Sequence, residues 1–359
     1  MFDNTFYKAA HDKKLTVGYF GGSITEGAGA SDASKTSWRA GVTDWFRTNY
    51  PDADVTEIQA AIGGTGSDLG MYRYDIDLLA KKPDLVFIEF AVNDSWMAYD
   101  AILSQTEAIY RKIRKHSAYT DIVCIITTTK TITDGLEKGG EFTARSAHSV
   151  IAHRYDTPVI DVGNLLHFEV LKTGGDFLKF TTDTVHPNDD GYAIYTDCIT
   201  AYLKQWADRA DGAYTAHAMP APVCEKVYEN ACMTECTAAD SYTADGFAFV
   251  GKSLCGRYPS YIEATVPGSS FSFTFTGENC GFYWMLAKDS GDALVSVDGG
   301  EELSLRSWDH YCKSFNRAGP AFFAKGLPYG KHSVTVRVAD TKADESEGTV
   351  LRIGALLIS

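Results

Sequence analysis

The sequence predicts an α/β domain with a parallel sheet, followed by an all-β sandwich. Over about the first 208 residues, short apolar runs alternate with segments of helical spacing. Nearly continuous apolar strands separated by helices are typical of a parallel sheet that is covered on both faces. Beyond about residue 223, short alternating runs are separated by glycine and Asp-Gly turns. This second pattern is typical of an antiparallel sandwich.

The first domain is expected to contain five strands, at residues 15–20, 55–62, 84–90, 122–129 and 158–162. The expected helices are residues 38–46, 67–82, 101–116, 142–154 and 190–206. Ser67 or Asp68 is expected to cap the second of these helices, because either side chain can accept a hydrogen bond from the first turn.

Residues 209–223 are rich in alanine and proline and indicate a linker or strap. We therefore expect domains at residues 1–208 and 224–359, joined by that linker. The strands expected in the second domain are residues 260–266, 270–276, 281–286, 293–297, 332–338 and 350–357.

The net charge of −14 argues against nucleic acid and anionic membranes as partners. The first six residues lack the basic and apolar regions of a signal peptide, and no run of about 18 apolar residues occurs. We therefore expect a cytoplasmic protein with reduced thiols and no membrane span. No metal site is expected either, because four of the later cysteines contain no CxxC pair, namely Cys224, Cys232, Cys236 and Cys255.

Four polar segments follow predicted strands or precede the last helix. They contain Ser23 in Gly21-Gly22-Ser23-Ile24-Thr25, Gly64 in the glycine-rich run 60–67, Asn93 in Phe90-Ala91-Val92-Asn93-Asp94, and His186 in Asp183-Thr184-Val185-His186-Pro187. Because neighbouring parallel strands end at one edge of a sheet, these segments are expected to converge there.

This set of segments resembles that of the SGNH hydrolases, also called the GDSL esterase/lipase superfamily, over about residues 12–208. The resemblance implies a flavodoxin-like, three-layer α/β/α fold and hydrolysis without a cofactor. It implies that Ser23 is the nucleophile, that His186 is the general base and then acid, and that Asp183 orients the imidazole.

The resemblance also implies three oxyanion donors: the backbone N–H groups of Ser23 and Gly64 and the side-chain amide of Asn93. Gly63 is the rival for the glycine role, although Gly64 fits the segment better. The chain departs from the family's Gly-Asp-Ser at Gly22, which puts the rigidity of the loop in doubt more than activity. The G-x-S-x-G elbow of α/β-hydrolases and the G-x-G-x-x-G of dinucleotide sites are absent.

The second domain resembles the jelly-roll-like sandwiches that accompany carbohydrate esterases and bind glycans. Aromatic and polar side chains of one loop are candidate glycan contacts, namely Trp308, Asp309, His310 and Tyr311. Trp38 and Trp96 lie near the four segments in sequence and are further candidates. In each case the alternative is an aromatic side chain that packs inside the protein or between its domains.

The chain resembles in particular bacterial two-domain esterases that remove O-acetyl groups from mannan-type oligosaccharides. The resemblance implies an acetylated oligosaccharide as substrate and an acyl-enzyme intermediate, in a protein that could be a homo-oligomer. Two alternatives stay open: an SGNH esterase or lipase that acts on a non-carbohydrate acyl ester or thioester, and a non-catalytic glycan-binding protein. The second domain could instead serve assembly.

Overall fold

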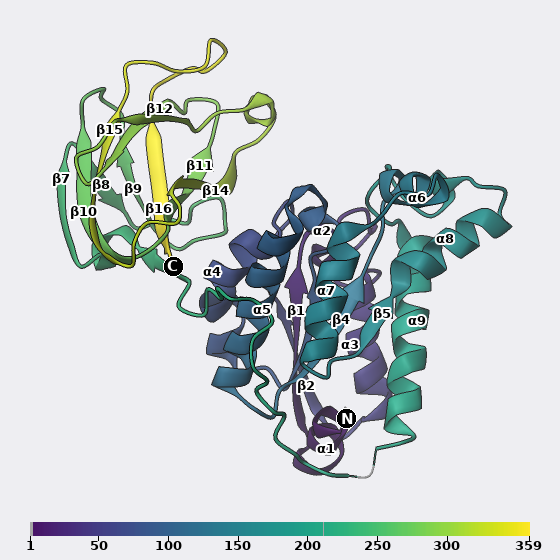
Figure 1. The fold of residues 1–359 in the computed structure, drawn as a ribbon. Coiled ribbons are helices and arrows are strands. Elements are labelled where there is room, and N and C mark those ends of the chain that lie inside the picture. The colour runs from purple at the N-terminus through teal and green to yellow at the C-terminus, as the bar shows by residue number, and fades with distance from the viewer. Residues whose placement is uncertain (1–2, 211) are drawn as a thin grey trace. The chain divides into compact units, whose positions relative to one another are not determined.

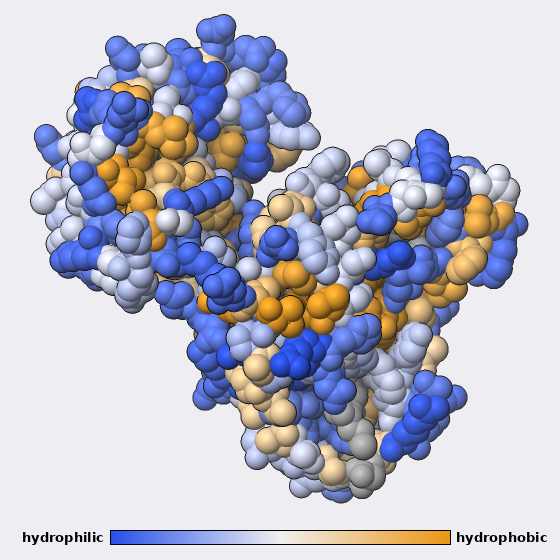
Figure 2. Space-filling view, in the orientation of Figure 1, coloured by the Kyte–Doolittle hydropathy of each residue, from blue (hydrophilic) through white to orange (hydrophobic). Residues whose placement is uncertain are grey.

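The computed structural model describes residues 3–210 and 212–359, which form two compact units, Met1–Glu229 and Asn230–Ser359 (Figure 1). We call them the N-terminal and the C-terminal unit. Within the described residues, no helix combines the length and apolarity that crossing a bilayer requires. None of the eight cysteines, all of which lie in the described residues, forms a disulfide. On the face shown in Figure 2, hydrophilic residues interrupt the apolar ones on both units.

The N-terminal unit contains a five-stranded sheet whose strands are all parallel and have the order β2-β1-β3-β4-β5. The strands are β1 (Lys14–Gly21), β2 (Asp54–Gln59), β3 (Leu85–Glu89), β4 (Asp121–Ile126) and β5 (Val159–Asp161). The flavodoxin-like order reverses between β1 and β3, and ligands of such sheets bind in the crevice beyond the carboxyl ends at that point. This confirms the predicted fold class of the first domain.

Helices cover both faces of this sheet (Figure 1). On one face α3 and α8 pack against α9, and on the other α5 packs against α4 and α7. Their bounds are α3 (Trp38–Asn49), α4 (Ser67–Asp77), α5 (Tyr99–His116), α7 (Thr143–Arg154), α8 (Val162–Lys172) and α9 (Asp189–Ala207). Shorter helices are α1 (Asn4–Tyr7), which runs into a π-helical turn at Lys8–Asp12, α2 (Ser23–Glu26) and α6 (Lys130–Glu137).

Residues 213–229, which we call the strap, run along the N-terminal unit beside α5 (Figure 1). The buried carboxylate of Glu107 on α5 accepts hydrogen bonds from the N–H groups of Val223 and Cys224, at 2.7 and 2.8 Å. At the other end of the strap, His217 lies 2.7 Å from the buried carboxylate of Asp121. The segment that the sequence suggested as a linker or strap is therefore fastened to the N-terminal unit through buried acceptors.

The C-terminal unit consists of two antiparallel sheets with the orders β13-β12-β15-β10-β7 and β14-β11-β16-β9-β8, and β6 pairs with β16. Apolar side chains of both sheets form one core that is rich in aromatics, including Phe273 of β10 and Phe282 of β11. This confirms the predicted all-β fold. The strands are β6 (Cys232–Glu235), β7 (Ser241–Asp245), β8 (Ala248–Val250), β9 (Tyr261–Ala264), β10 (Ser270–Gly277), β11 (Cys280–Leu286), β12 (Asp292–Val297), β13 (Leu303–Arg306), β14 (Arg317–Ala324), β15 (Gly330–Val338) and β16 (Leu351–Ile358).

Candidate active site

Ser23 follows the end of β1 and begins the single-turn helix α2. The glycine before it is needed for space: a Cβ at Gly22 would lie 2.2 Å from Oδ1 of Asn93. Gly22 therefore lets the segment after β3 approach the serine turn directly. A side chain at position 22 would require Asn93 to move in this chain.

Ser23, His186 and Asp183 form a continuous chain of hydrogen bonds. His186 Nε2 lies 2.9 Å from Ser23 Oγ, and His186 Nδ1 lies 2.8 Å from Asp183 Oδ2. If Asp183 accepts the Nδ1 proton, the lone pair of Nε2 faces the serine hydroxyl, as a general base requires. The structure thus brings Ser23 together with Asp183 and His186, which follow it by 160 and 163 positions in the sequence.

Asp183 also holds its own loop in shape. Its Oδ1 accepts hydrogen bonds from the N–H groups of Val185 and His186, at 2.6 and 2.7 Å. Burial acts to raise the pKa of Asp183, but the hydrogen bonds from the His186 side chain and from these two N–H groups outweigh it and lower the pKa. Asp183 is therefore a carboxylate at neutral pH, and its Oδ2 is placed to accept the Nδ1 proton of His186.

The candidate oxyanion donors differ in whether their N–H groups are already engaged. The N–H of Gly63 donates to Glu26 Oε2 at 2.8 Å, so that group is engaged. Gly64 has a φ of 73°, which only glycine adopts readily. Among the described hydrogen bonds, none uses the N–H groups of Ser23 or Gly64 or the side-chain amide of Asn93. These contacts favour Gly64 over Gly63 as a donor.

Helix α9 joins the serine loop to the histidine loop. The hydroxyl of Tyr192, which is buried, donates toward the carbonyls of Ile24 and Ala28, at 3.0 and 2.7 Å. At the start of the same helix, Asp189 accepts hydrogen bonds from the N–H and the hydroxyl of Ser31. The spacing between Ser23 and His186 is therefore set by several contacts, not by the loops alone.

Arg73 is a buried cation that the sequence did not single out. Its guanidinium donates to the carbonyls of Gly21 and Ala60, at 3.0 and 2.5 Å, and pairs with Asp77 at 2.7 Å. The guanidinium also lies 4.5 Å from the centre of the Phe20 ring. Arg73 thus ties the segment after β1 to the segment after β2. The available signal was its position four residues after buried Leu69, on the inner face of α4.

The predicted contact at Trp38 is wrong. Its side chain is fully buried and packs edge-on against Tyr19 and Phe87 in the core, so it cannot reach a substrate. Trp96 instead is 87% exposed on the turn Asn93–Trp96, directly after β3. It keeps its place as a predicted substrate contact.

The four predicted glycan contacts of the second domain lie together on one loop of the C-terminal unit. Trp308 is half-buried against the core, whereas Tyr311 is 50% exposed. Asp309 accepts a hydrogen bond from the Tyr311 N–H and pairs with Arg317. His310 is exposed, and its ring lies against that of Tyr311. Their role in glycan binding stays a prediction.

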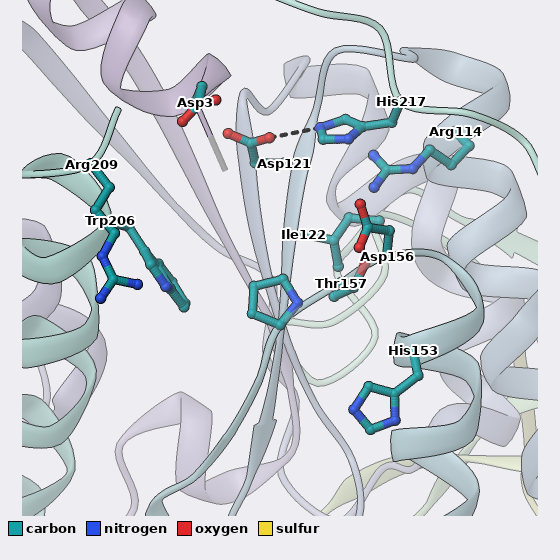
Figure 3. Close-up of a pocket in the computed structure, with 11 residues that line it drawn as sticks. Asp3, Arg114, Asp121, Ile122, His153, Asp156, Thr157, Trp206, Arg209 and His217 are labelled. Atoms are coloured by element: carbon teal, nitrogen blue, oxygen red, sulfur yellow. Dashed lines mark hydrogen bonds and ion pairs between the residues drawn. The ribbon is translucent and has the colours of Figure 1, made fainter. Parts of the chain in front are cut away.

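A separate cavity of about 470 Å³ lies at the opposite edge of the sheet, where β4 and β5 begin (Figure 3). Acidic and basic side chains line it together, and His217 Nε2 lies 2.7 Å from Asp121 Oδ1 there. None of the four polar segments contributes to its lining.

Comparisons with known proteins agree with this geometry. Residues 19–194, which contain all four segments, match the model of the GDSL-like Lipase/Acylhydrolase family. An acetylxylan esterase of Geobacillus stearothermophilus is 32% identical over 100 residues, which are 26% of this chain and 45% of that protein. The match thus spans less than half the length of that relative.

Solved structures of a two-domain esterase (CEX) active on acetylated mannans resemble the whole chain. One has a TM-score of 0.84 at 24% identity and covers 99% of this chain and 93% of its own. Another, co-crystallised with mannopentaose, has a TM-score of 0.82 at 23% identity and covers 96% and 90%. At this identity the likeness establishes the fold of both units. The family match, in contrast, spans the residues of the candidate site, and the chain therefore contains a GDSL-like lipase/acylhydrolase domain.

Proposed function

We propose that this protein is a serine esterase that removes O-acetyl groups from carbohydrate through an acyl-enzyme intermediate. The observation that carries the proposal is the hydrogen-bonded chain Ser23–His186–Asp183 beside three unengaged donors, at the switch point of the sheet. Membership of an acylhydrolase family supports the same reaction class.

In the proposed reaction, His186 Nε2 takes the proton of the Ser23 hydroxyl as Oγ attacks the acetyl carbonyl carbon. The N–H groups of Ser23 and Gly64 and the amide of Asn93 stabilise the oxyanion. His186 then gives the proton to the departing sugar oxygen, and the C–O bond breaks. Water, deprotonated by the same imidazole, cleaves the acetyl-serine ester and releases acetate. Asp183 orients the ring and stabilises its charge throughout.

The nucleophile is tested with Ser23→Ala on p-nitrophenyl acetate. Loss of the attacking oxygen should lower kcat by more than about 1,000-fold, while the protein stays folded. The matched control is Ser34→Ala: Ser34 is exposed, and its side chain bonds only to nearby Asp32. That variant should keep wild-type turnover. Near-normal hydrolysis by Ser23→Ala would end the proposal.

The carbohydrate part of the proposal draws on the relatives and on Trp96. Both named relatives are esterases of acetylated polysaccharides, and the two-domain architecture of one extends over this chain. An almost fully exposed indole three residues after Asn93 offers a flat apolar face for a sugar ring. Acetate release from acetylated manno- and xylo-oligosaccharides should exceed release of longer acyl groups from p-nitrophenyl esters. A preference for long acyl chains would instead identify a lipase or another acyl esterase.

We further propose that the C-terminal unit binds the glycan through the loop Trp308–Tyr311. Tyr311→Ala should then weaken the binding of mannan oligosaccharides measured by calorimetry, without changing turnover of p-nitrophenyl acetate. Unchanged affinity would favour a role of this unit in assembly. Cytoplasmic location and a homo-oligomeric state stay predictions, which cell fractionation and light scattering measure.

A further inference from the structure

Glu89 is a buried carboxyl group that the proposed reaction does not use. It is the last residue of β3, is fully buried, and lies opposite Gly21 in the pairing of β1 with β3. Its Oε2 accepts a hydrogen bond from the Thr25 hydroxyl at 2.8 Å, and its Oε1 accepts one from the Thr127 hydroxyl at 2.7 Å. The N–H of Gly22 also donates to this carboxylate.

Two of these three donors stand on either side of the predicted nucleophile. Gly22 is the residue before Ser23, and Thr25 lies two residues after it on α2. A helix of one turn has little stability of its own, because each end leaves backbone groups without helical partners. The direction of the Ser23 hydroxyl and N–H therefore depends on what holds this turn from outside.

We propose that Glu89 is a positioning residue of the esterase site: its carboxyl group holds the Gly22 N–H and the Thr25 hydroxyl and thereby fixes the turn that carries Ser23. The inference rests on the proposed function. Glu89 touches neither the substrate nor the reacting atoms, so it acts through Ser23. A glutamate serves here because one carboxyl oxygen can accept both donors while the other accepts Thr127.

The hold on the serine turn does not require a charge on Glu89. Burial raises the pKa of Glu89 to about 7, against the opposing effect of its hydrogen bonds and of His148. When the carboxyl group is neutral, its proton can sit on Oε1 and donate to the oxygen of Thr127, which leaves Oε2 free to accept from the serine turn. The titratable groups that interact with Glu89 are His148 on α7, Cys124 on β4, and Tyr192 and Tyr195 on α9.

The structure offers a matched pair of variants. Thr25 and Thr127 are both fully buried and both donate to the same carboxyl group, but only Thr25 belongs to the serine turn. Thr25→Val and Thr127→Val each remove one hydroxyl at nearly constant volume and leave one carboxyl oxygen short of a donor. Both should lower the melting temperature to a similar extent. Only Thr25→Val should lower kcat on p-nitrophenyl acetate, by about tenfold with KM nearly unchanged. The reason is that this change displaces the nucleophile but leaves the groups that bind the substrate in place.

Two further variants test whether Glu89 acts by accepting hydrogen bonds or through its negative charge. Glu89→Gln keeps a carbonyl oxygen for the serine turn and an NH₂ group for Thr127, so it should keep kcat within about threefold. Glu89→Leu has no acceptor and should lose about 100-fold in kcat. In Glu89→Leu, the rate at which diethyl p-nitrophenyl phosphate labels Ser23 should fall together with kcat. Loosening of the structure far from Ser23 would not slow this labelling.

The outcomes separate this inference from the proposed function. Continued hydrolysis by Ser23→Ala ends the proposed function, whatever the Glu89 variants do. With Ser23 established, equal losses of kcat in Thr25→Val and Thr127→Val would overturn the positioning role, as would unchanged kcat in Thr25→Val. A large loss in folded Glu89→Gln would overturn it too, because the charge would then matter more than the hydrogen bonds. Should Glu89→Leu not fold, the threonine pair decides alone.

Discussion

Replacing Asp183 by asparagine tests the proton chain without removing a side chain. In the structure, Oδ1 of Asp183 accepts two backbone N–H groups and Oδ2 faces Nδ1 of His186. An asparagine must keep its oxygen on the two N–H groups, because they have no other acceptor. Its NH₂ group then faces Nδ1, which becomes an acceptor and moves the ring proton to Nε2. The imidazole can no longer take the proton of Ser23.

The expected loss of kcat depends on how far the side chains of Asp183 and His186 are exposed to solvent. In a serine-protease triad that is shielded from solvent, the same Asp-to-Asn substitution lowers kcat by about 10⁴-fold. Here the side chain of Asp183 is 53% exposed and that of His186 is 26% exposed, so water can replace part of the lost contact. We therefore expect kcat to fall by about 100- to 1,000-fold, or about 3–4 kcal/mol in the barrier.

The assay is kcat on p-nitrophenyl acetate at neutral pH, with thermal unfolding as a check on folding. Asp176→Asn is the matched control: Asp176 also caps a short turn, by accepting from the Leu178 N–H at 3.0 Å, but faces no imidazole. It should keep wild-type kcat. Turnover by folded Asp183→Asn within threefold of wild type would refute the assignment of His186 as a base that Asp183 orients.

The structure predicts the outcome of three further experiments: a substitution of Trp96, a change of pH and a truncation of the strap. Trp96→Ala should lower kcat/KM on acetylated oligosaccharides by about tenfold and leave p-nitrophenyl acetate unaffected, because the proposed role of the indole is to stack on the sugar and not on the acetyl group; equal losses on both substrates would contradict this. The folded state raises the pKa of Glu89 from 4.5 to about 7 and therefore binds the Glu89 proton more tightly than the unfolded state does. The free energy of unfolding therefore falls as the pH rises through that window. Relative to Glu89→Gln, the wild type should lose up to about 3 kcal/mol between about pH 4.5 and pH 8 in urea unfolding, and a pH-independent difference would disprove the linkage. Finally, a fragment ending at residue 208 should melt below one ending at residue 229, because buried Glu107 and Asp121 lose their partners on the strap; equal melting temperatures would show that the strap contributes nothing.

The sheet and the main parts of the site could be predicted because their signals are local. The central strands β1, β3 and β4 are apolar runs, and each of the four segments stands next to one strand or helix. Helix α8 was missed because its apolar side chains form no single stripe: Phe168 and Leu171 on it are exposed. Strand β14 was missed because it contains Pro320, which a sheet tolerates at the edge position that β14 occupies.

Features that depend on distant partners could not be predicted. Ser67 or Asp68 was expected to cap α4, but the structure has Gly66 at that position, and the N–H of Ser67 is held instead by Asp94 from the segment after β3. Arg73 and Glu89 are similar cases. Their burial becomes favourable only when carbonyls or hydroxyls from distant segments surround them, and the local sequence does not show which segments those are.

The central claim is that the hydroxyl of Ser23, activated by His186, is the group that takes up the acyl portion of the substrate. Diethyl p-nitrophenyl phosphate reacts with activated serines, and peptide mass mapping locates the group it leaves behind. We predict one diethylphosphoryl group per chain, on the peptide that contains Ser23, formed in proportion to the loss of esterase activity and absent from Ser23→Ala. Complete inactivation with the label on another residue, or full activity with Ser23 labelled, would contradict the account.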